Sequence, residues 1–305
     1  MECEIIMKNK RFLALALLVL MLCVALASCG NKPESNVKSY VKSIGEAKNL
    51  EYTIKIYRKN HMYNDREQIF RSETKARQGK IQLDPLSYSE FYVDGDSKYD
   101  YFGGTGEYAL ADKRRIEEAL TTYGSSDSLF NKDKYYAPND KELYKASSDY
   151  KSGKWNWKVA DPKEHTVPEI GNKEAVLKLY EKYADKFVRT EKNDYVFLEF
   201  KGDVTKDIDD IKKLQGSFVK SNLYKEKSLV KSIDIKITLV MKKEGSFGKL
   251  IPCEAIISTD TKLESTKENW KMNNEDHFEI YYKNINDTEV KPFSDFDKSK
   301  IETKK

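Results

Sequence analysis

The chain has 305 residues, and 34% of them are charged, with 54 basic and 50 acidic side chains and a net charge of +4. A nucleic-acid-binding protein needs clustered excess positive charge, so this balanced composition predicts no nucleic-acid partner. The length is sufficient for one large domain, or two small ones, with a substantial apolar core.

The N-terminal stretch from Met7 to Cys29 has the layout of an exported precursor. A basic cluster precedes an apolar run from Phe12 to Ala27, and small residues follow. At about sixteen residues the run is short for a bilayer span, which needs about twenty. An uncleaved transmembrane anchor or a buried helix fits less well, because residues 30–36 are polar and rich in helix breakers. The order predicts a secretion signal.

The last four residues of this stretch, Leu26-Ala27-Ser28-Cys29, resemble the lipobox of bacterial lipoproteins. There a diacylglycerol alkylates the thiol, and the peptide bond before the cysteine is cut. The resemblance implies a signal peptide over 1–28 and lipidation of Cys29. We expect translation to start at Met7, because Glu2 and Glu4 suit the basic end of a signal poorly.

The mature chain would then hang from a membrane by the acyl chains on Cys29, which hold a protein there essentially permanently. Its charge would be 51 − 48 = +3, because the signal removes three basic and two acidic residues. Richness in Lys, Asn, Ile and Tyr resembles the composition of AT-rich, low-GC bacteria and favours a Gram-positive cell membrane, with the exported domain on its extracytoplasmic face. We expect a tether over 29–36, one domain over 37–296 and a polar tail over 297–305.

The cysteines indicate a fold without internal disulfides. Cys3 and Cys23 lie in the signal and Cys29 would carry lipid, so only Cys253 remains in the exported domain. Cys253 lies in a strand-like apolar run with no histidine nearby in sequence. A buried structural thiol is therefore favoured over a nucleophile.

The first half of the domain reads as a helix followed by strands. Apolar residues at helical spacing predict a helix over 37–47, and alternation predicts a strand over 50–57. Residues 65–108 resemble a run of antiparallel strands with a tight turn at Asp94-Gly95-Asp96-Ser97. The aspartates there do not predict a calcium loop, because Lys98 and Thr105 occupy positions five and twelve, where oxygen ligands are needed.

The middle of the chain is less regular. We expect a helix over 111–123, and a long polar connection over 125–152 that contains one short helix at 140–146. Trp155, Trp157 and Val159 then alternate along a predicted strand, which places all three on one face. Two tryptophans on one face suit either a binding platform or an ordinary core.

The second half contains the strongest pattern. Asn172 is expected to cap a helix whose apolar stripe reaches Phe187, and a strand over 195–201 and a helix over 204–214 follow. A hairpin then turns at 244–248 and returns over 249–263, and a last strand through Phe278 ends before Pro292. The first strand of this hairpin presents one aliphatic face: Ile233, Ile235, Ile237, Leu239 and Met241. The chain is therefore predicted to be α+β, a large antiparallel sheet with a few helices on one face.

The lipobox, the early helix–strand unit over 37–57, the Tyr- and Trp-bearing strands and the closing hairpin together resemble the Gram-positive lipoproteins related to LolA and LppX. The resemblance spans about residues 35–295. It implies a strongly curved, half-barrel sheet whose concave face is closed by helices, with a cavity that holds lipid acyl chains in some members. It implies no catalytic residue.

Motifs of catalytic chemistry are not found in the sequence. His61, His165 and His277 are widely separated, and none has a partner at metal-ligand spacing. The glycine-rich segment 103–106 lacks the Lys-Ser/Thr of a phosphate-binding loop, and there is no Gly-x-Ser-x-Gly elbow. We predict no catalytic residue, no metal and no cofactor.

The sequence therefore predicts a non-catalytic, membrane-anchored lipoprotein that binds a lipid or amphiphile in a concave sheet. The aliphatic face named above, together with Trp155 and Trp157, is expected to line the ligand. One alternative is a structural or regulatory module with a filled core that meets an envelope protein through the 125–152 connection. A second is an uncharacterised hydrolase. Large aliphatic residues line a cavity or fill it equally well, so residue type does not separate the first two.

Overall fold

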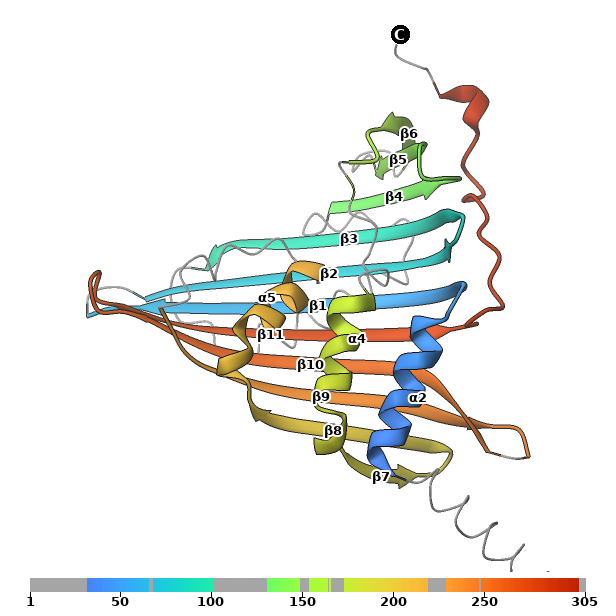
Figure 1. Cartoon of the computed structure of the whole chain (residues 1–305). Helices are drawn as coiled ribbons and strands as arrows, with labels where there is room; N and C mark the ends of the chain where they lie inside the picture. Colours follow the sequence, from blue (N-terminus) through green and yellow to red (C-terminus); the bar gives the residue numbers. More distant parts are fainter. Residues whose placement is uncertain are drawn as a thin grey trace, which may run out of the picture.

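The computed structural model describes residues 32–65, 68–100, 131–148, 154–163, 165, 173–218, 229–246 and 248–301. These residues form one antiparallel sheet of eleven strands with a few helices, as the predicted α+β class requires (Figure 1). The sheet is not closed, because β6 forms one edge and β7 the other. In order the strands run β6-β5-β4-β3-β2-β1-β11-β10-β9-β8-β7.

The sheet has two runs of sequential neighbours that meet in the middle. One comprises β1 (Asn49–Tyr63), β2 (Gln68–Leu83), β3 (Leu86–Asp100), β4 (Asn131–Ala137), β5 (Leu143–Ser148) and β6 (Trp155–Ala160). The other comprises β7 (Val188–Lys192), β8 (Tyr195–Asp203), β9 (Val230–Glu244), β10 (Lys249–Ser265) and β11 (Trp270–Lys283). The two runs join where β1 pairs with β11, from Glu51 opposite Lys283 to Tyr63 opposite Lys271.

Three helices cover one face of this sheet: α2 (Pro33–Gly45), α4 (Lys173–Lys182) and α5 (Ile208–Phe218). In Figure 1 they lie across the half that contains β1 and β8–β11, and α2 contacts β8, β9 and β10 directly. We call this side the helix face. Short 3₁₀ turns follow α4 at Ala184–Lys186, precede α5 at Thr205–Asp207 and end the described chain at Lys298–Lys300.

Helix α2 begins earlier than the sequence predicted, at Pro33 rather than Val37. Proline fits the first turn of a helix, where its missing N–H group has no partner to lose. The segment 33–36, expected to be tether, is therefore the first turn of α2. Asn36 in this turn is buried and accepts a hydrogen bond of 2.8 Å from Arg189 Nε, which joins α2 to β7.

Strand alternation follows the predicted pattern in the centre of the sheet. Along β1 the buried residues are every second one from Leu50 to Arg58, because successive side chains of a strand point to opposite faces. The predicted hairpin is confirmed, with β9 and β10 joined by a turn in which Gly245 and Gly248 have positive φ values of 71° and 63°. The predicted strand over 195–201 and the helix over 204–214 correspond to β8 and to η2 with α5.

Two local predictions are wrong. The expected turn at Asp94–Ser97 is part of β3, where Gly95 pairs with Thr74 of β2, and the chain reverses instead at Asp84–Pro85. The expected helix at 140–146 is largely strand β5, and β4 also lies inside the supposed 125–152 connection. In both places pairing with neighbouring strands outweighs local preference. The expected helix over 111–123 and the cap Asn172 lie outside the described residues.

Candidate functional site

The aliphatic face predicted on β9 lies at the centre of the helix face. Its five residues are between 0% and 1% exposed and belong to one apolar cluster. The neighbouring strands add the residues that face the same way: Val196, Leu198, Phe200, Ala255, Ile257, Phe278 and Ile280. The structure therefore brings this part of the predicted lining together.

The helices close the cluster from the other side. They contribute the apolar stripe that faces the sheet: Val37, Tyr40, Val41, Ile44, Val176, Leu179, Tyr180, Ile211 and Leu214. Tyr40 of α2 donates a hydrogen bond of 2.9 Å from its hydroxyl to the carbonyl oxygen of Glu254 on β10. This bond fixes α2 on the sheet, because it pairs the buried hydroxyl of Tyr40 with a backbone acceptor of β10.

Tyr180 of α4 lies beside Tyr40, with the two ring centroids 6.1 Å apart in an edge-to-face arrangement. The side chain is fully buried, and its hydroxyl has no hydrogen-bond partner among the described residues. Burial raises the pKa of Tyr180 well above its ordinary value, so the group is a neutral hydroxyl. A buried hydroxyl without a partner costs about 1–3 kcal/mol, which makes this atom an exception in an otherwise apolar layer.

The predicted tryptophans do not join this layer. Trp157 is paired in register with Ala146 of β5, Ala146 with Lys134 of β4, and Lys134 with Phe91 of β3. Residues paired in this way point to the same side of the sheet, which here is the side opposite the helices. Trp155 lies two residues away on that opposite face, 6.0 Å from the ring of Phe91 in an edge-to-face contact. The prediction that both tryptophans line one site together with the aliphatic face of β9 is therefore wrong.

Both tryptophans are half-buried under the segment 284–301, which we call the C-terminal segment. Phe296 packs 5.0 Å from Trp157 and Phe293 packs 5.9 Å from it. Asp295 accepts two bonds of 2.9 Å from Lys134, whose ammonium lies 4.4 Å from the centroid of the Trp155 ring. The tryptophans therefore hold this segment, although Val159 beyond them is 52% exposed.

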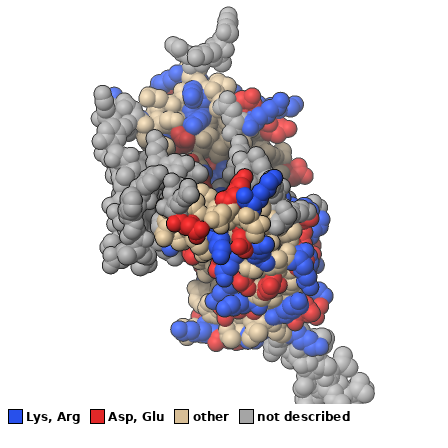
Figure 2. All heavy atoms as spheres, turned by 90° about the vertical axis from the view of Figure 1, so that its left-hand side faces the viewer, with Lys and Arg blue, Asp and Glu red and all other residues tan. Residues whose placement is uncertain are grey.

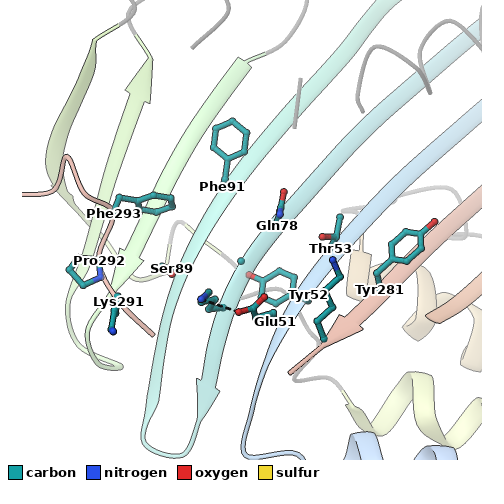
Figure 3. A pocket seen from close by; sticks show the side chains of 13 residues that line it. Glu51, Tyr52, Thr53, Gln78, Ser89, Phe91, Tyr281, Lys291, Pro292 and Phe293 are labelled. Carbon is teal, nitrogen blue, oxygen red and sulfur yellow. Dashed lines mark ion pairs between the residues drawn. The ribbon is translucent and has the colours of Figure 1, made fainter. Parts of the chain in front are cut away.

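Beside this contact the opposite face carries a pocket of about 330 Å³ (Figure 3). The floor comes from the middle of the sheet, and residues 291–293 of the C-terminal segment form one wall. The floor side chains stand in two registered rows: Lys283, Glu51, Lys80 and Ser89, then Tyr281, Thr53, Gln78 and Phe91. Sequence reasoning missed this pocket because its residues come from four strands and a distant segment.

A buried polar cluster lies on the helix face of β1–β3. Glu90 is fully buried and accepts hydrogen bonds from Tyr52 at 2.6 Å and from Arg77 Nε at 3.1 Å, with His165 Nε2 at 2.9 Å. Tyr52 reaches Glu90 over Gly79, which lies between them in register. A Cβ atom at Gly79 would come 2.9 Å from the Tyr52 hydroxyl oxygen and 2.3 Å from the Ser89 carbonyl oxygen.

The neighbours of Glu90 in this cluster determine its pKa. Burial by itself would raise the pKa of Glu90, but the Arg77 guanidinium and the bonds from His165 and Tyr52 hold it below its ordinary value. The carboxylate is therefore charged at neutral pH and balances Arg77, whose pKa is raised in return. Because every oxygen of Glu90 has a partner, the cluster is a structural tie between strands.

The structure also places three polar residues of β10 and β11 in a hydrogen-bonded chain. Ser258 Oγ lies 2.8 Å from His277 Nδ1, and His277 Nε2 lies 3.1 Å from Glu279 Oε1. This order could relay a proton from the serine. Attack on a carbonyl also needs donors for the developing oxyanion, and the backbone around Ser258 lies in continuous ladders with β9 and β11. Sequence reasoning missed this series of hydrogen bonds because Ser258 and His277 meet only across a hairpin.

Cys253 lies at an irregularity in the β9–β10 pairing, between Pro252 and Glu254. It is half-buried rather than fully buried, and its thiol donates to the carbonyl oxygen of Val240 at 3.4 Å. Burial raises the pKa of the thiol to about 11, so it is protonated at neutral pH. A protonated thiol is a poor nucleophile, in line with the structural role predicted.

Within the described ranges no three His, Cys, Asp or Glu side chains gather closely enough to hold a metal ion. None of the helices described there has the length and apolar character needed to cross a membrane. On the face seen in Figure 2, basic and acidic side chains are interspersed rather than segregated.

No known protein family matches the chain, and no curated protein matches it either. Among solved structures it is similar to a DUF1329 family protein from Desulfovibrio piger, with 8% identity, 89% of this chain and 100% of that chain covered, and a TM-score of 0.20. It is also similar to Ail, the attachment invasion locus protein of Yersinia pestis, in complex with a heparin analogue, with 7% identity, 77% and 99% covered, and a TM-score of 0.15. Neisserial surface protein A gives 4% identity, 76% and 96% covered, and a TM-score of 0.14. At these scores the likenesses carry no argument about function.

Proposed function

We propose that the protein is a lipid-anchored, extracytoplasmic lipoprotein that binds an apolar ligand, a lipid or amphiphile, between its helices and its sheet. Cys29 carries the anchor, on the outer face of a cell membrane. The sheet is a half-barrel of the LolA and LppX kind, and the helices cover its concave side. An open eleven-stranded sheet with α2, α4 and α5 on one face supports this architecture.

The observation that carries the proposal is the unpartnered hydroxyl of Tyr180. Ligand sites for amphiphiles are mostly apolar, with a few polar groups that fix orientation. The buried hydroxyl of Tyr180, with no hydrogen-bond partner among the described residues, is such a group. An ester or headgroup oxygen of the ligand would accept its hydrogen bond and remove the cost of its burial.

Entry of the ligand requires the helix layer to move, because the β9 face is almost completely buried beneath it. Helix α2 is bonded to the sheet through Tyr40 and to β7 through Asn36. At the end of α4, Lys182 bonds instead to Asp207 and Asp210, at the surface. We therefore assign the movement to α4, which also carries Tyr180.

A second candidate is a non-catalytic envelope interaction module whose core is filled by its own side chains. The near-complete burial of the β9 face under α2 favours it. The two candidates differ in one property. A filled core has no state in which Tyr180 gains a partner, whereas a ligand site does.

The test compares two tyrosines of the same layer, Tyr180→Phe and the matched control Tyr40→Phe. The chain from Asn31 to Lys305 is purified without detergent, and bound lipid is measured by native mass spectrometry. We expect a lipid-sized mass on the unmodified chain and on Tyr40→Phe, and less of it on Tyr180→Phe.

Stability gives the second readout. In stripped protein, Tyr180→Phe should leave stability unchanged or raise it by up to about 1–3 kcal/mol, since it removes an unsatisfied hydroxyl. Tyr40→Phe should cost about 0.5–1.5 kcal/mol, since it removes a hydrogen bond that is made. Adding back extracted lipid should reverse the sign for Tyr180→Phe only. A Tyr180→Phe effect that is the same with and without lipid, and no binding of lipid or apolar dye, would favour the filled core.

A further inference from the structure

The pocket on the face opposite the helices lies outside the proposed lipid site, and of its lining residues only Tyr52 also belongs to the apolar cluster of the helix face. Its floor is the middle of the sheet, where β11, β1, β2 and β3 run side by side. Backbone groups there are engaged in ladders with both neighbours, so a peptide cannot add to the site as an extra strand. A ligand must be recognised by side chains.

One row of the floor has aromatic ends and a polar middle. Tyr281 and Phe91 stand at the ends, and Thr53 and Gln78 lie between them (Figure 3). Phe91 is buried, whereas the other three side chains are at least partly exposed. The row spans three strand spacings, or roughly 14 Å. A sugar presents C–H faces that pack on aromatic rings, and hydroxyl groups that pair with amide and hydroxyl side chains. Tyr281 of the row and Phe293 of the wall offer the ring contacts, and Thr53 and Gln78 offer the polar ones.

The other row and the wall supply charge. Glu51 is paired with Lys80 at 2.9 Å, and this bond lowers the pKa of Glu51. Lys283 stands beside Glu51 in register, and Lys291 comes from the C-terminal segment. With one carboxylate and three ammonium groups, the lining has a net charge of 3 − 1 = +2, and Lys291 is also paired with the exposed Glu289 at 2.7 Å.

The C-terminal segment that forms the wall is itself fixed to the sheet. Phe293 packs against a small apolar cluster that contains Phe91, and Asp295 ties the same segment to Lys134. The volume of about 330 Å³ lies at the lower end of the range for small-molecule sites, roughly 300–1,000 Å³. One or two sugar rings, free or at the end of a longer saccharide, suit that size.

From this juxtaposition we propose that the pocket binds an anionic saccharide, with rings packed on Tyr281 and Phe293. Thr53 and Gln78 meet its hydroxyl groups, and Lys283 and Lys291 meet its carboxylate or phosphate. The proposal does not rest on lipid binding, because the two sites lie on opposite faces of the sheet.

The test uses the chain from Cys29 to Lys305 with Cys29→Ser, in low salt, and isothermal titration. The probes are a hyaluronan tetrasaccharide, which carries glucuronate, the neutral chitotetraose, glucose 6-phosphate, glucose and sodium sulfate. We expect the hyaluronan tetrasaccharide to bind about tenfold or more tightly than chitotetraose, because charge-assisted hydrogen bonds are the stronger ones. Comparing the affinities of glucose 6-phosphate and glucose shows whether a phosphate group strengthens binding as a carboxylate does.

Three variants locate the binding. Lys283→Gln should weaken the binding of the anionic probe about tenfold, and Thr53→Val should weaken both tetrasaccharides by about threefold. Lys271→Gln is the matched control on the same face of β11, away from the pocket, and should change nothing. Equal binding of charged and neutral probes, insensitivity to Lys283→Gln, or equal competition by sulfate would each overturn the proposal.

Discussion

At the scale of single residues, Glu90 shows how this sheet tolerates charge in its interior. Its oxygens contact Tyr52, Arg77 and His165, and no side chain at Gly79 blocks the approach of Tyr52. The charge is kept because it is fully hydrogen-bonded, which is the condition for burying a carboxylate at moderate cost.

Replacing this carboxylate by Glu90→Gln should lower the free energy of unfolding by about 3–5 kcal/mol at pH 7, because Arg77 is left buried without its counter-charge. The folded pKa of Glu90 lies below its ordinary value, so its contribution is present above about pH 4.3 and is lost as the pH falls through the lowered pKa. The variant should therefore lose stability less steeply with acid below about pH 4.3.

Urea unfolding between pH 3 and pH 7 checks both statements. Glu51→Gln is the control, because Glu51 forms a partly exposed pair with Lys80 and should cost under about 1 kcal/mol. Parallel acid limbs for Glu90→Gln and the unmodified chain would contradict the role given to Glu90.

At the scale of elements, the C-terminal segment acts as a strap across the strands β4–β6. These strands are short and form one edge of the sheet, where a few ladder bonds alone stabilise weakly. Phe293 and Phe296 bury the tryptophans, Asp295 pairs with Lys134, and Lys298 bonds Glu142 at 2.7 Å. The supposed polar tail thus begins with residues that join the fold.

Asp295→Ala should destabilise this edge by about 1–2 kcal/mol, because Lys134 is buried and loses its carboxylate partner while Asp295 itself is partly exposed. Hydrogen exchange measures the effect strand by strand. Amides of β4–β6 should exchange faster and those of β9 and β10 at the unchanged rate. Asp297→Ala, which removes the cap of the last 3₁₀ turn and an exposed pair with Lys300, is the control. A uniform rise in exchange would count against a local strap.

At the scale of the whole molecule, the proposed anchor decides where the sheet works. Helix α2 begins four residues after Cys29, so little chain separates the fold from the membrane surface. Both faces of the sheet, with the lipid site on one and the saccharide pocket on the other, would then lie close to the lipid headgroups.

Cys29→Ser should move the protein from the membrane fraction to the aqueous fraction, because acyl chains contribute about 0.8 kcal/mol per buried CH₂ and none would be attached. Cys253→Ser is the matched control, since its thiol lies in the fold, and should remain membrane-bound. Cell fractionation together with intact mass measures the outcome. Retention of Cys29→Ser in the membrane would refute lipidation as the anchor.

Many of the strands and helices could be predicted from the sequence because their patterns are local. Alternation of apolar and polar residues, with glycines at the turn, predicts the β9–β10 hairpin, and apolar residues at helical spacing predict α5. The turn at Asp94–Ser97 failed because an Asp-Gly pair permits a turn without requiring one. The helix at 140–146 failed because β4 and β6 offer ladder partners to β5 that the local sequence does not reveal.

By itself the sequence determined the α+β class and the apolar face of β9, since each depends on neighbouring residues, and it carries the prediction of an export signal for the same reason. Only the tertiary structure decided that Trp155 and Trp157 face away from that apolar layer. The face of a strand follows from its register with every strand between, and a shift of one residue in any pairing reverses it. The saccharide pocket, the Glu90 cluster and the strap depend on the same non-local parity, so strand pairing, rather than composition, placed their side chains together.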